Sequence, residues 1–155
     1  MQPVKKISAN AEKRLKQAEQ FCQNTGARFT PIRRTILALM YAHQEYLTAY
    51  ELLHLLREKN PKVEAMTVYR ALDFLQAQKL IHRIASQNAY ATCDTPHHAH
   101  HTYFLLCERC QQTQEVDIQS LNKVFKLITK QYDFFLSDKP VEIIGVCKNC
   151  RRENP

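Results

Sequence analysis

Two pairs of cysteines share the spacing C-x-x-C, as "CERC" at 107–110 and "CKNC" at 147–150. Each pair places two thiols on a tight turn, and two such pairs complete a tetrahedral thiolate site for zinc. A single C-x-x-C is also typical of a redox motif, but that motif opens a helix after a strand, and we expect neither copy to open a helix. The spacing therefore predicts a structural zinc site of Cys107, Cys110, Cys147 and Cys150.

A histidine and a cysteine form a second candidate site, in the segment "IHRIASQNAYATC" at 81–93. The segment is typical of two short strands around a turn, and with the turn centred on Gln87-Asn88, His82 faces Cys93. Facing Cβ atoms lie roughly 4.5 to 5.5 Å apart, which suits two ligands of one metal. The alternative is a buried free thiol beside an exposed histidine. The two further ligands would be one histidine, from His97, His98, His100 and His101, and one carboxylate, from Asp94, Glu115 and Asp117.

The elements that must carry these residues begin with four predicted helices. Helical spacing of apolar residues, capping residues and helix stops indicate them. Thr30 is expected to cap the second helix, which starts at Pro31, and Thr48 and Glu51 form a capping box for the third. With the hairpin at 81–93 they predict a winged helix-turn-helix. The helices are expected in the ranges 11–22, 31–40, 48–60 and 66–78, with inner faces at Ala11, Leu15, Ala18, Cys22; Ile32, Ile36, Leu39, Met40; and Val68, Ala71, Leu72, Leu75.

The outer face of the fourth helix suits contact with DNA. In a winged helix this element enters the major groove, using residues near its start. Arg70 is the expected reader of a base edge, because a guanidinium grips the O6 and N7 atoms of guanine with two hydrogen bonds. Arg28, Arg33 and Arg34, near the start of the second helix, are placed for phosphates. The alternative is a solvated helix face that carries Tyr69 and Arg70.

The charge of the chain is distributed unevenly. Residues 1–86 contain 14 Lys and Arg against 7 Asp and Glu, whereas residues 87–155 contain 8 against 8. A basic part joined to a neutral part favours a module that binds a polyanion, attached to a sensing or partner module. An ordinary basic surface is the other interpretation.

The second part of the chain predicts a small α+β unit. After the polar linker "DTPHHAHH" we expect strands at 102–107, 112–118 and 141–146, and a helix at 120–131. So small a unit is expected to associate with a second copy. The predicted boundaries are 1–93 for a DNA-binding domain, 94–101 for the linker and 102–155 for a dimerisation and zinc-binding domain.

Other classes of protein lack support in the sequence. Nothing at the start resembles a signal peptide and no apolar run approaches about 18 residues, so we expect a cytoplasmic location and no membrane partner. Six cysteines in a reducing compartment favour metal binding over disulfides. An H-E-x-x-H motif and a zinc-deaminase signature are both missing, so we expect no enzyme.

The stretches "RFTPIRRTIL", "TAYELLHLLRE" and "TVYRALDFL", together with the two C-x-x-C pairs, resemble the ferric uptake regulator family and, within it, the zinc-responsive branch. The resemblance covers nearly the whole chain. It implies a homodimeric repressor with an N-terminal winged helix and a C-terminal dimerisation domain, which binds operator DNA when loaded with zinc. It also implies two zinc ions per chain, one structural and one regulatory.

Positions follow from the resemblance. The structural site matches the four cysteines of the two C-x-x-C pairs. The regulatory site matches His82, Cys93, His100 and Glu115, with His98 and His101 as alternatives to His100. The DNA-contacting positions match Tyr50, Thr67, Tyr69 and Arg70.

The resemblance also bears on which metal is sensed. The iron-sensing branch carries a compact His-His-Asp-His run, whereas "HHAHH" here has alanine in place of the aspartate. A thiolate ligand also favours zinc over ferrous iron. Iron, manganese or peroxide remains the alternative signal.

Overall fold

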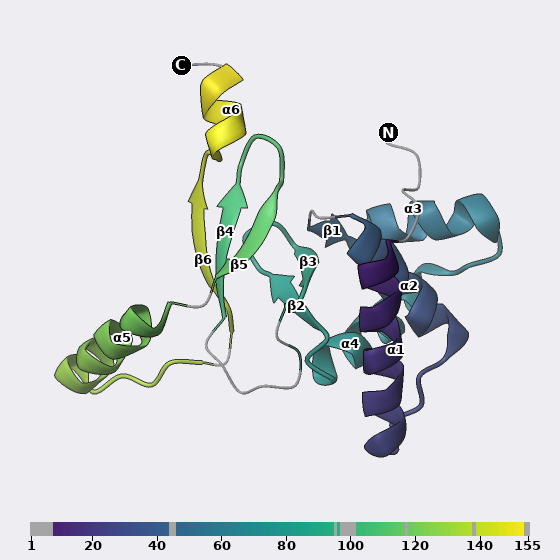
Figure 1. Cartoon of the computed structure of the whole chain (residues 1–155), viewed down its shortest axis with the longest axis horizontal. Coiled ribbons are helices and arrows are strands. Elements are labelled where there is room, and N and C mark those ends of the chain that lie inside the picture. The colour runs from purple at the N-terminus through teal and green to yellow at the C-terminus, as the bar shows by residue number, and fades with distance from the viewer. Residues whose placement is uncertain are drawn as a thin grey trace. The chain divides into compact units, whose positions relative to one another are not determined.

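A computed structural model of the chain (Figure 1) describes residues 8–43, 46–94, 96, 102–116, 118–137 and 139–153. It divides into two units, Met1–His97 and His98–Pro155. The first unit contains four helices and a small sheet, and the second a three-stranded sheet with two helices. The predicted α+β class is confirmed.

The four helices of the first unit form where the apolar periodicity predicts them. Their buried faces also match: α1 buries Ala11, Leu15, Ala18 and Cys22, and α4 buries Val68, Ala71, Leu72 and Leu75. These stripes meet in one hydrophobic core, to which α2 and α3 also contribute. The helices are α1 (Ala9–Asn24), α2 (Pro31–Ala42), α3 (Ala49–Lys59) and α4 (Ala65–Ala77).

Helix ends are set by local hydrogen bonds. At the start of α3 the Thr48 hydroxyl accepts from the Glu51 amide at 3.2 Å, and the Glu51 carboxylate accepts from the Thr48 amide at 2.7 Å, so the predicted capping box is present. Thr30 occupies the cap position of α2, but its side chain makes no capping hydrogen bond, contrary to the expectation. The proline at the first helical position has no N–H to satisfy, and its fixed φ favours the helix there.

A short sheet makes the wing, with one strand before α3 and two after α4. Its strands are β1 (Leu47–Thr48), β2 (Ile81–Ile84) and β3 (Ala89–Thr92), in the order β1-β3-β2. Helices followed by this antiparallel hairpin confirm the predicted winged-helix plan (Figure 1).

The hairpin register differs from the prediction by two residues. His82 pairs with Ala91, and Ile84 with Ala89, so His82 does not face Cys93. The reason is the turn, which spans residues 85–88 with Asn88 in the left-handed region at φ 46°, instead of centring on Gln87-Asn88. Because side chains alternate between the two faces, a shift of two residues keeps every side chain on its predicted face. Cys93 is thus a diagonal neighbour of His82 on the same face.

The second unit is built around one central strand. The strands β4 (Tyr103–Cys107), β5 (Thr113–Val116) and β6 (Val141–Gly145) lie in the order β5-β4-β6. β5 is antiparallel to β4, whereas β6 is parallel to it, because α5 (Gln119–Tyr132) returns the chain to the start of the sheet. The helix α6 (Lys148–Glu153) follows β6.

Burial in the second unit is concentrated on β4. Among its described residues, the buried ones all lie in 102–107. The Tyr103 ring stacks on Phe125 of α5 with centroids 5.7 Å apart, and its hydroxyl donates to Asn122 at 2.7 Å. Such a small core is unlike that of the first unit and needs further support. No helix in the described part of the chain is long and apolar enough to cross a membrane.

Candidate metal centres and nucleic-acid interface

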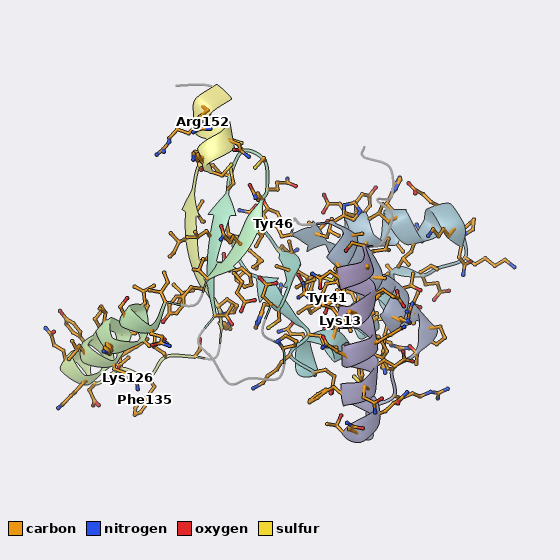
Figure 2. The ribbon with its side chains drawn as sticks, in the orientation of Figure 1. Lys13, Tyr41, Tyr46, Lys126, Phe135 and Arg152 are labelled. Atoms are coloured by element: carbon orange, nitrogen blue, oxygen red, sulfur yellow. The ribbon has the colours of Figure 1, made fainter. Side chains whose placement is uncertain are left out.

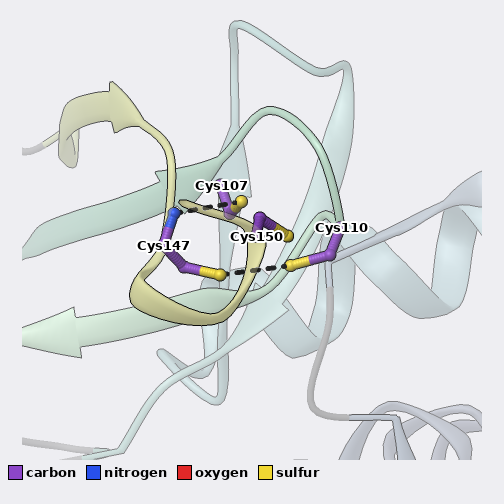
Figure 3. Close-up of side chains that lie close together, drawn as sticks. All are labelled: Cys107, Cys110, Cys147 and Cys150. Carbon is purple, nitrogen blue, oxygen red and sulfur yellow. Dashed lines mark hydrogen bonds between the residues drawn. The ribbon is translucent and has the colours of Figure 1, made fainter. Parts of the chain in front are cut away.

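The two C-x-x-C pairs meet because two parallel strands end side by side. Cys107 at the end of β4 pairs with Gly145 at the end of β6, and the Glu108 amide donates to the Gly145 carbonyl at 3.0 Å. Each cysteine pair therefore starts at the same edge of the sheet. Figure 3 shows the four thiols gathered there.

The sulfur geometry fits a tetrahedral ion. The four Sγ atoms all lie within 4.8 Å of one another, and those of Cys110 and Cys147 are 3.7 Å apart. With Zn–S bonds of about 2.3 Å, the edge of a regular tetrahedron is about 3.8 Å. The donor set and its spacing therefore fit zinc with four protein ligands.

Thiol ionisation in this cluster is uneven. The backbone N–H groups of Cys110 and Cys147 lower the pKa of Cys107 to about 6, whereas the hydrogen bond with the Cys110 side chain, together with burial, raises the pKa of Cys150 to about 12. Like charges this close disfavour one another. A divalent cation is what allows all four sulfurs to be thiolates, and its binding releases the protons.

The second cysteine pair does open a helix, so that expectation was wrong. α6 begins at Lys148, directly after Cys147, and the Arg151 amide donates to the Cys147 carbonyl at 3.0 Å. The helix places Cys150 back over the turn that carries the other pair, where the Arg109 guanidinium donates to the Cys150 carbonyl at 3.0 Å. A helix start alone is compatible with a redox motif, but the approach of the second pair makes a four-sulfur site.

The hairpin brings together the second candidate pair. The Cys93 amide donates to the Leu80 carbonyl at 3.0 Å, which continues the β2–β3 ladder one step beyond Thr92. Diagonal neighbours on one face remain within reach of long side chains. A ligand nitrogen of His82 and the Cys93 sulfur lie within 4.8 Å of each other. His82 is half-buried and Cys93 is fully buried, so both donors of this nitrogen–sulfur pair are partly shielded from water.

The other predicted ligands are described only in part. Glu115 lies in β5 opposite Phe104 and is half-buried. His100 lies outside the residues that the structure describes, as do His97, His98, His101 and Asp117. Asp94 follows Cys93 directly and is exposed. The complete ligand set therefore stays a prediction.

The face of α4 that is expected to read DNA is exposed to solvent. Tyr69 is 48% exposed, and Thr67 and Arg70 are exposed beside it, while the opposite face packs into the core. Tyr50, in the first turn of α3, is 76% exposed. Large aromatic side chains that remain outside a well-filled core are available to a partner.

The arginines near α2 differ in their surroundings. Arg28 is exposed. The Arg33 guanidinium lies 3.6 Å from the ring centroid of Phe74 in α4 and also donates to the Arg28 carbonyl. Arg34 pairs with Glu12 of α1 at 2.5 Å. Arg33 and Arg34 thus hold helices of this unit together, and their predicted phosphate contacts stay predictions.

One residue beside the hairpin pair was not predicted. Arg14 of α1 donates to the Cys93 carbonyl. A cation at position 14 lies between Ala11 and Ala18 at helical spacing, on the edge of the buried stripe. A charged residue beside the buried stripe is the sequence signal that distinguishes Arg14 from the other basic residues of α1.

Comparisons with known proteins agree with this geometry. Residues 24–144 match the model of the ferric uptake regulator family. The chain is 35% identical to the zinc uptake regulation protein of Escherichia coli (strain K12) over 139 residues, which cover 88% of this chain and 80% of that protein.

Solved structures resemble the chain along most of its length. A zinc uptake regulator complexed with zinc and DNA is 32% identical, with a TM-score of 0.86 over 94% of this chain and 98% of that one. The holo form of the regulator XcZur is 34% identical, with a TM-score of 0.78 over 89% of this chain and 96% of that one.

Proposed function

We propose, because the chain belongs to the ferric uptake regulator family, that it is a zinc-responsive transcriptional repressor. It binds operator DNA as a zinc-loaded homodimer and controls genes of zinc uptake and homeostasis. The observation that carries this proposal is the His82–Cys93 pair, because it places two metal donors on the wing of a DNA-binding fold. The resemblance to a regulator complexed with zinc and DNA supports it.

Two zinc ions per chain have different roles in this proposal. Cys107, Cys110, Cys147 and Cys150 hold a structural ion, because four protein ligands leave no position for water and no opening for catalysis. The regulatory ion is held by His82, Cys93, His100 and Glu115. When bound, zinc supplies a cationic centre that gathers a thiolate, imidazoles and a carboxylate from separate parts of the chain.

The choice of zinc as the signal rests on ligand chemistry. A thiolate suits zinc better than it suits ferrous iron, and Cys93 is positioned to supply one. The wing follows the DNA-reading helix closely, because residues 78–80 alone connect α4 to β2. An ion that ties the wing to a dimerisation unit would set how two reading helices are presented to one operator.

In the DNA contact, roles divide by position. Arg70 reads a base edge, Thr67 and Tyr69 lie beside it on α4, and Tyr50 contributes from α3. Arg28 and Arg33 contact phosphates, which fix the register of the protein on the duplex without reading sequence. The excess of basic residues in 1–86 supports this use of the first unit.

A test of the proposed function compares operator binding by zinc-loaded and metal-stripped protein at fixed salt, because phosphate contacts make affinity depend steeply on salt. We expect zinc to raise the affinity by about 5- to 150-fold, the usual range for coupled sites. Equal affinity in the two states would remove zinc from the proposal.

The matched variants are Cys93→Ser and Cys22→Ser, because both thiols are fully buried in the first unit. We expect Cys93→Ser to lower the zinc content from about two ions per chain to about one and to abolish the zinc response, on the four-ligand logic above. Cys22 packs among apolar residues, so its variant should keep both properties. A Cys93→Ser protein that retains two ions would eliminate Cys93 as a ligand.

Dimerisation has a surface to use in the second unit. α5 buries none of its residues, and its apolar residues Val124, Leu127 and Ile128 share one face. Beyond the helix, Phe135 is 90% exposed and is marked in Figure 2. A contiguous apolar face of this kind indicates an interface, and a second copy of the chain is the occupant in the proposed repressor.

Leu127→Asp is therefore expected to give monomers where the natural chain is dimeric, because it buries a charge in an apolar interface. Analytical ultracentrifugation of the zinc-loaded protein measures the change. Lys126→Asp places the same residue one position away, on the polar side of α5, and should stay dimeric (Figure 2). Dimers that persist in Leu127→Asp would place the interface elsewhere.

A further inference from the structure

Arg14 reaches across the first unit to the residue that carries the proposed sensing thiol. Its guanidinium donates to the Cys93 carbonyl at 2.7 Å and lies 3.4 Å from a carboxylate oxygen of Asp94. These partners are 79 and 80 positions away in the sequence. The contact therefore joins the first helix to the point where the chain leaves the wing.

A second contact, with an aromatic ring, also holds the Arg14 guanidinium in place. Its guanidinium carbon lies 4.2 Å from the ring centroid of Tyr41, which belongs to α2 and is marked beside α1 in Figure 2. A planar guanidinium stacks on an aromatic face and still directs its N–H groups outward in its own plane. Tyr41 thereby helps to aim Arg14 at the Cys93 carbonyl.

These contacts act where the β-ladder ends. The hairpin pairs residues up to Thr92, and Cys93 makes one more bond, from its amide to the Leu80 carbonyl. Its carbonyl accepts from Arg14. Both backbone polar groups of Cys93 are thus bonded on either side of its buried side chain, so the position of its Cβ is determined by the first unit alone.

We propose that Arg14 is a positioning residue for the zinc-sensing thiol, which it holds ready for the ion by clamping the Cys93 carbonyl to α1. The inference rests on the proposed role of Cys93 as a ligand of the regulatory ion. Partners that orient metal ligands typically change metal affinity by about 10- to 100-fold when removed. Arg14 acts on the backbone of the ligand rather than on its sulfur.

Linkage gives the clamp a second consequence. If α1 helps to place the ligand, then an ion bound by that ligand stabilises the docking of α1 by the same factor. Zinc binding should therefore slow hydrogen exchange of the α1 amides around Leu15, a residue that lies far from the metal donors in sequence and is fully buried. Occupancy of the sensing site is in this way communicated to the first helix of the DNA-binding unit.

The experiment uses the full chain and Zn²⁺ in competition with a chelator, so that the weaker and the tighter ion are resolved. Arg14→Met keeps the aliphatic stem and removes the donors, whereas Arg14→Lys keeps the charge without the planar fork. We expect Arg14→Met to lower the affinity for the regulatory ion by about 10- to 100-fold, and Arg14→Lys to lower it less. The affinity of the four-cysteine site should not change in either variant. Lys13→Met removes one exposed cation from the same helix and is the matched control.

Further variants separate positioning from general stability. Tyr41→Leu should weaken binding of the regulatory ion more than Tyr41→Phe, because phenylalanine keeps the ring face and loses only the hydroxyl's interaction with Arg14. Ile36→Val loosens the core without touching the clamp and should bind both ions normally. In a Cys93→Ser background, Arg14→Met should have no further effect on zinc binding, since the ligand it positions is missing.

The outcomes distinguish this inference from the proposed function. If Cys93→Ser loses the second ion and Arg14→Met binds it like the natural chain, the clamp is wrong and the repressor proposal stands. An equal loss in Arg14→Met and Ile36→Val would also overturn the clamp, because the loss would then follow stability alone. If the natural chain binds a single ion, both proposals are overturned together.

Discussion

Replacing Cys107 by serine is expected to unfold the second unit and to release its zinc. A structural zinc site contributes roughly 10 to 16 kcal/mol in small peptides near neutral pH, which equals or exceeds the ~5 to 15 kcal/mol stability of a whole domain. The described residues of this unit bury little beyond β4, so packing cannot replace the ion. The variant should bind about one zinc ion fewer per chain, lose its dimeric state and show a lower helix and strand content by circular dichroism.

The control for Cys107→Ser is Cys93→Ser, which also removes one thiol and one proposed zinc ion. It should leave the second unit folded, because that unit keeps all four of its sulfurs within 4.8 Å of one another. Zinc content and thermal unfolding of the two variants separate the two sites. A Cys107→Ser chain that remains a folded dimer would show that the sulfur cluster is not the support of this unit.

A pair of substitutions on α4 should separate folding from recognition. Leu72 is fully buried, so Leu72→Ala is expected to lower the free energy of unfolding by about 2 to 5 kcal/mol, through lost burial and the cavity that remains. Arg70 is exposed on the other face, so Arg70→Ala should leave the free energy of unfolding unchanged. Loss of a bidentate base contact should instead lower operator affinity by about 1 to 3 kcal/mol and relax the preference at one base pair.

Urea unfolding and operator titrations at fixed salt measure the two effects. Asp73→Ala, on the exposed face one helical turn from Arg70, controls for changes that merely alter the surface of α4. If Arg70→Ala lowers the affinity for every DNA sequence by the same factor, Arg70 contacts a phosphate instead of a base.

The helices of the first unit could be predicted because their signals repeat. Four apolar positions in α1 and four in α4 follow the 3.6-residue period, and a buried stripe leaves that trace in any sequence. The capping box of α3 could also be predicted from the sequence, since it depends on two residues three positions apart. The strand β1, of two residues, and the helix α6, of six, were not predicted, because segments so short show no period.

The sites were predictable in composition but not in geometry. The C-x-x-C spacing identified the four thiols, whereas their convergence depends on β4 and β6 being parallel neighbours, which α5 and its return path decide. The hairpin register depended on the conformation of one residue, Asn88, and the sequence pattern did not specify its positive φ. The partner of Arg14 could not be predicted, because it is a backbone carbonyl, and a carbonyl carries no sequence signature.

Because β4 pairs with β6, an ion bound by the four sulfurs would also be a cross-link. Cys110 and Cys147 enclose the whole of β5, α5 and β6, so an ion held between them closes that stretch into a ring. Ring closure removes conformations from the unfolded chain and changes little in the folded one, which is how a disulfide stabilises a secreted protein. A metal ion held there would do the work of a covalent bridge, and it would be removed by a chelator or acid instead of a reductant.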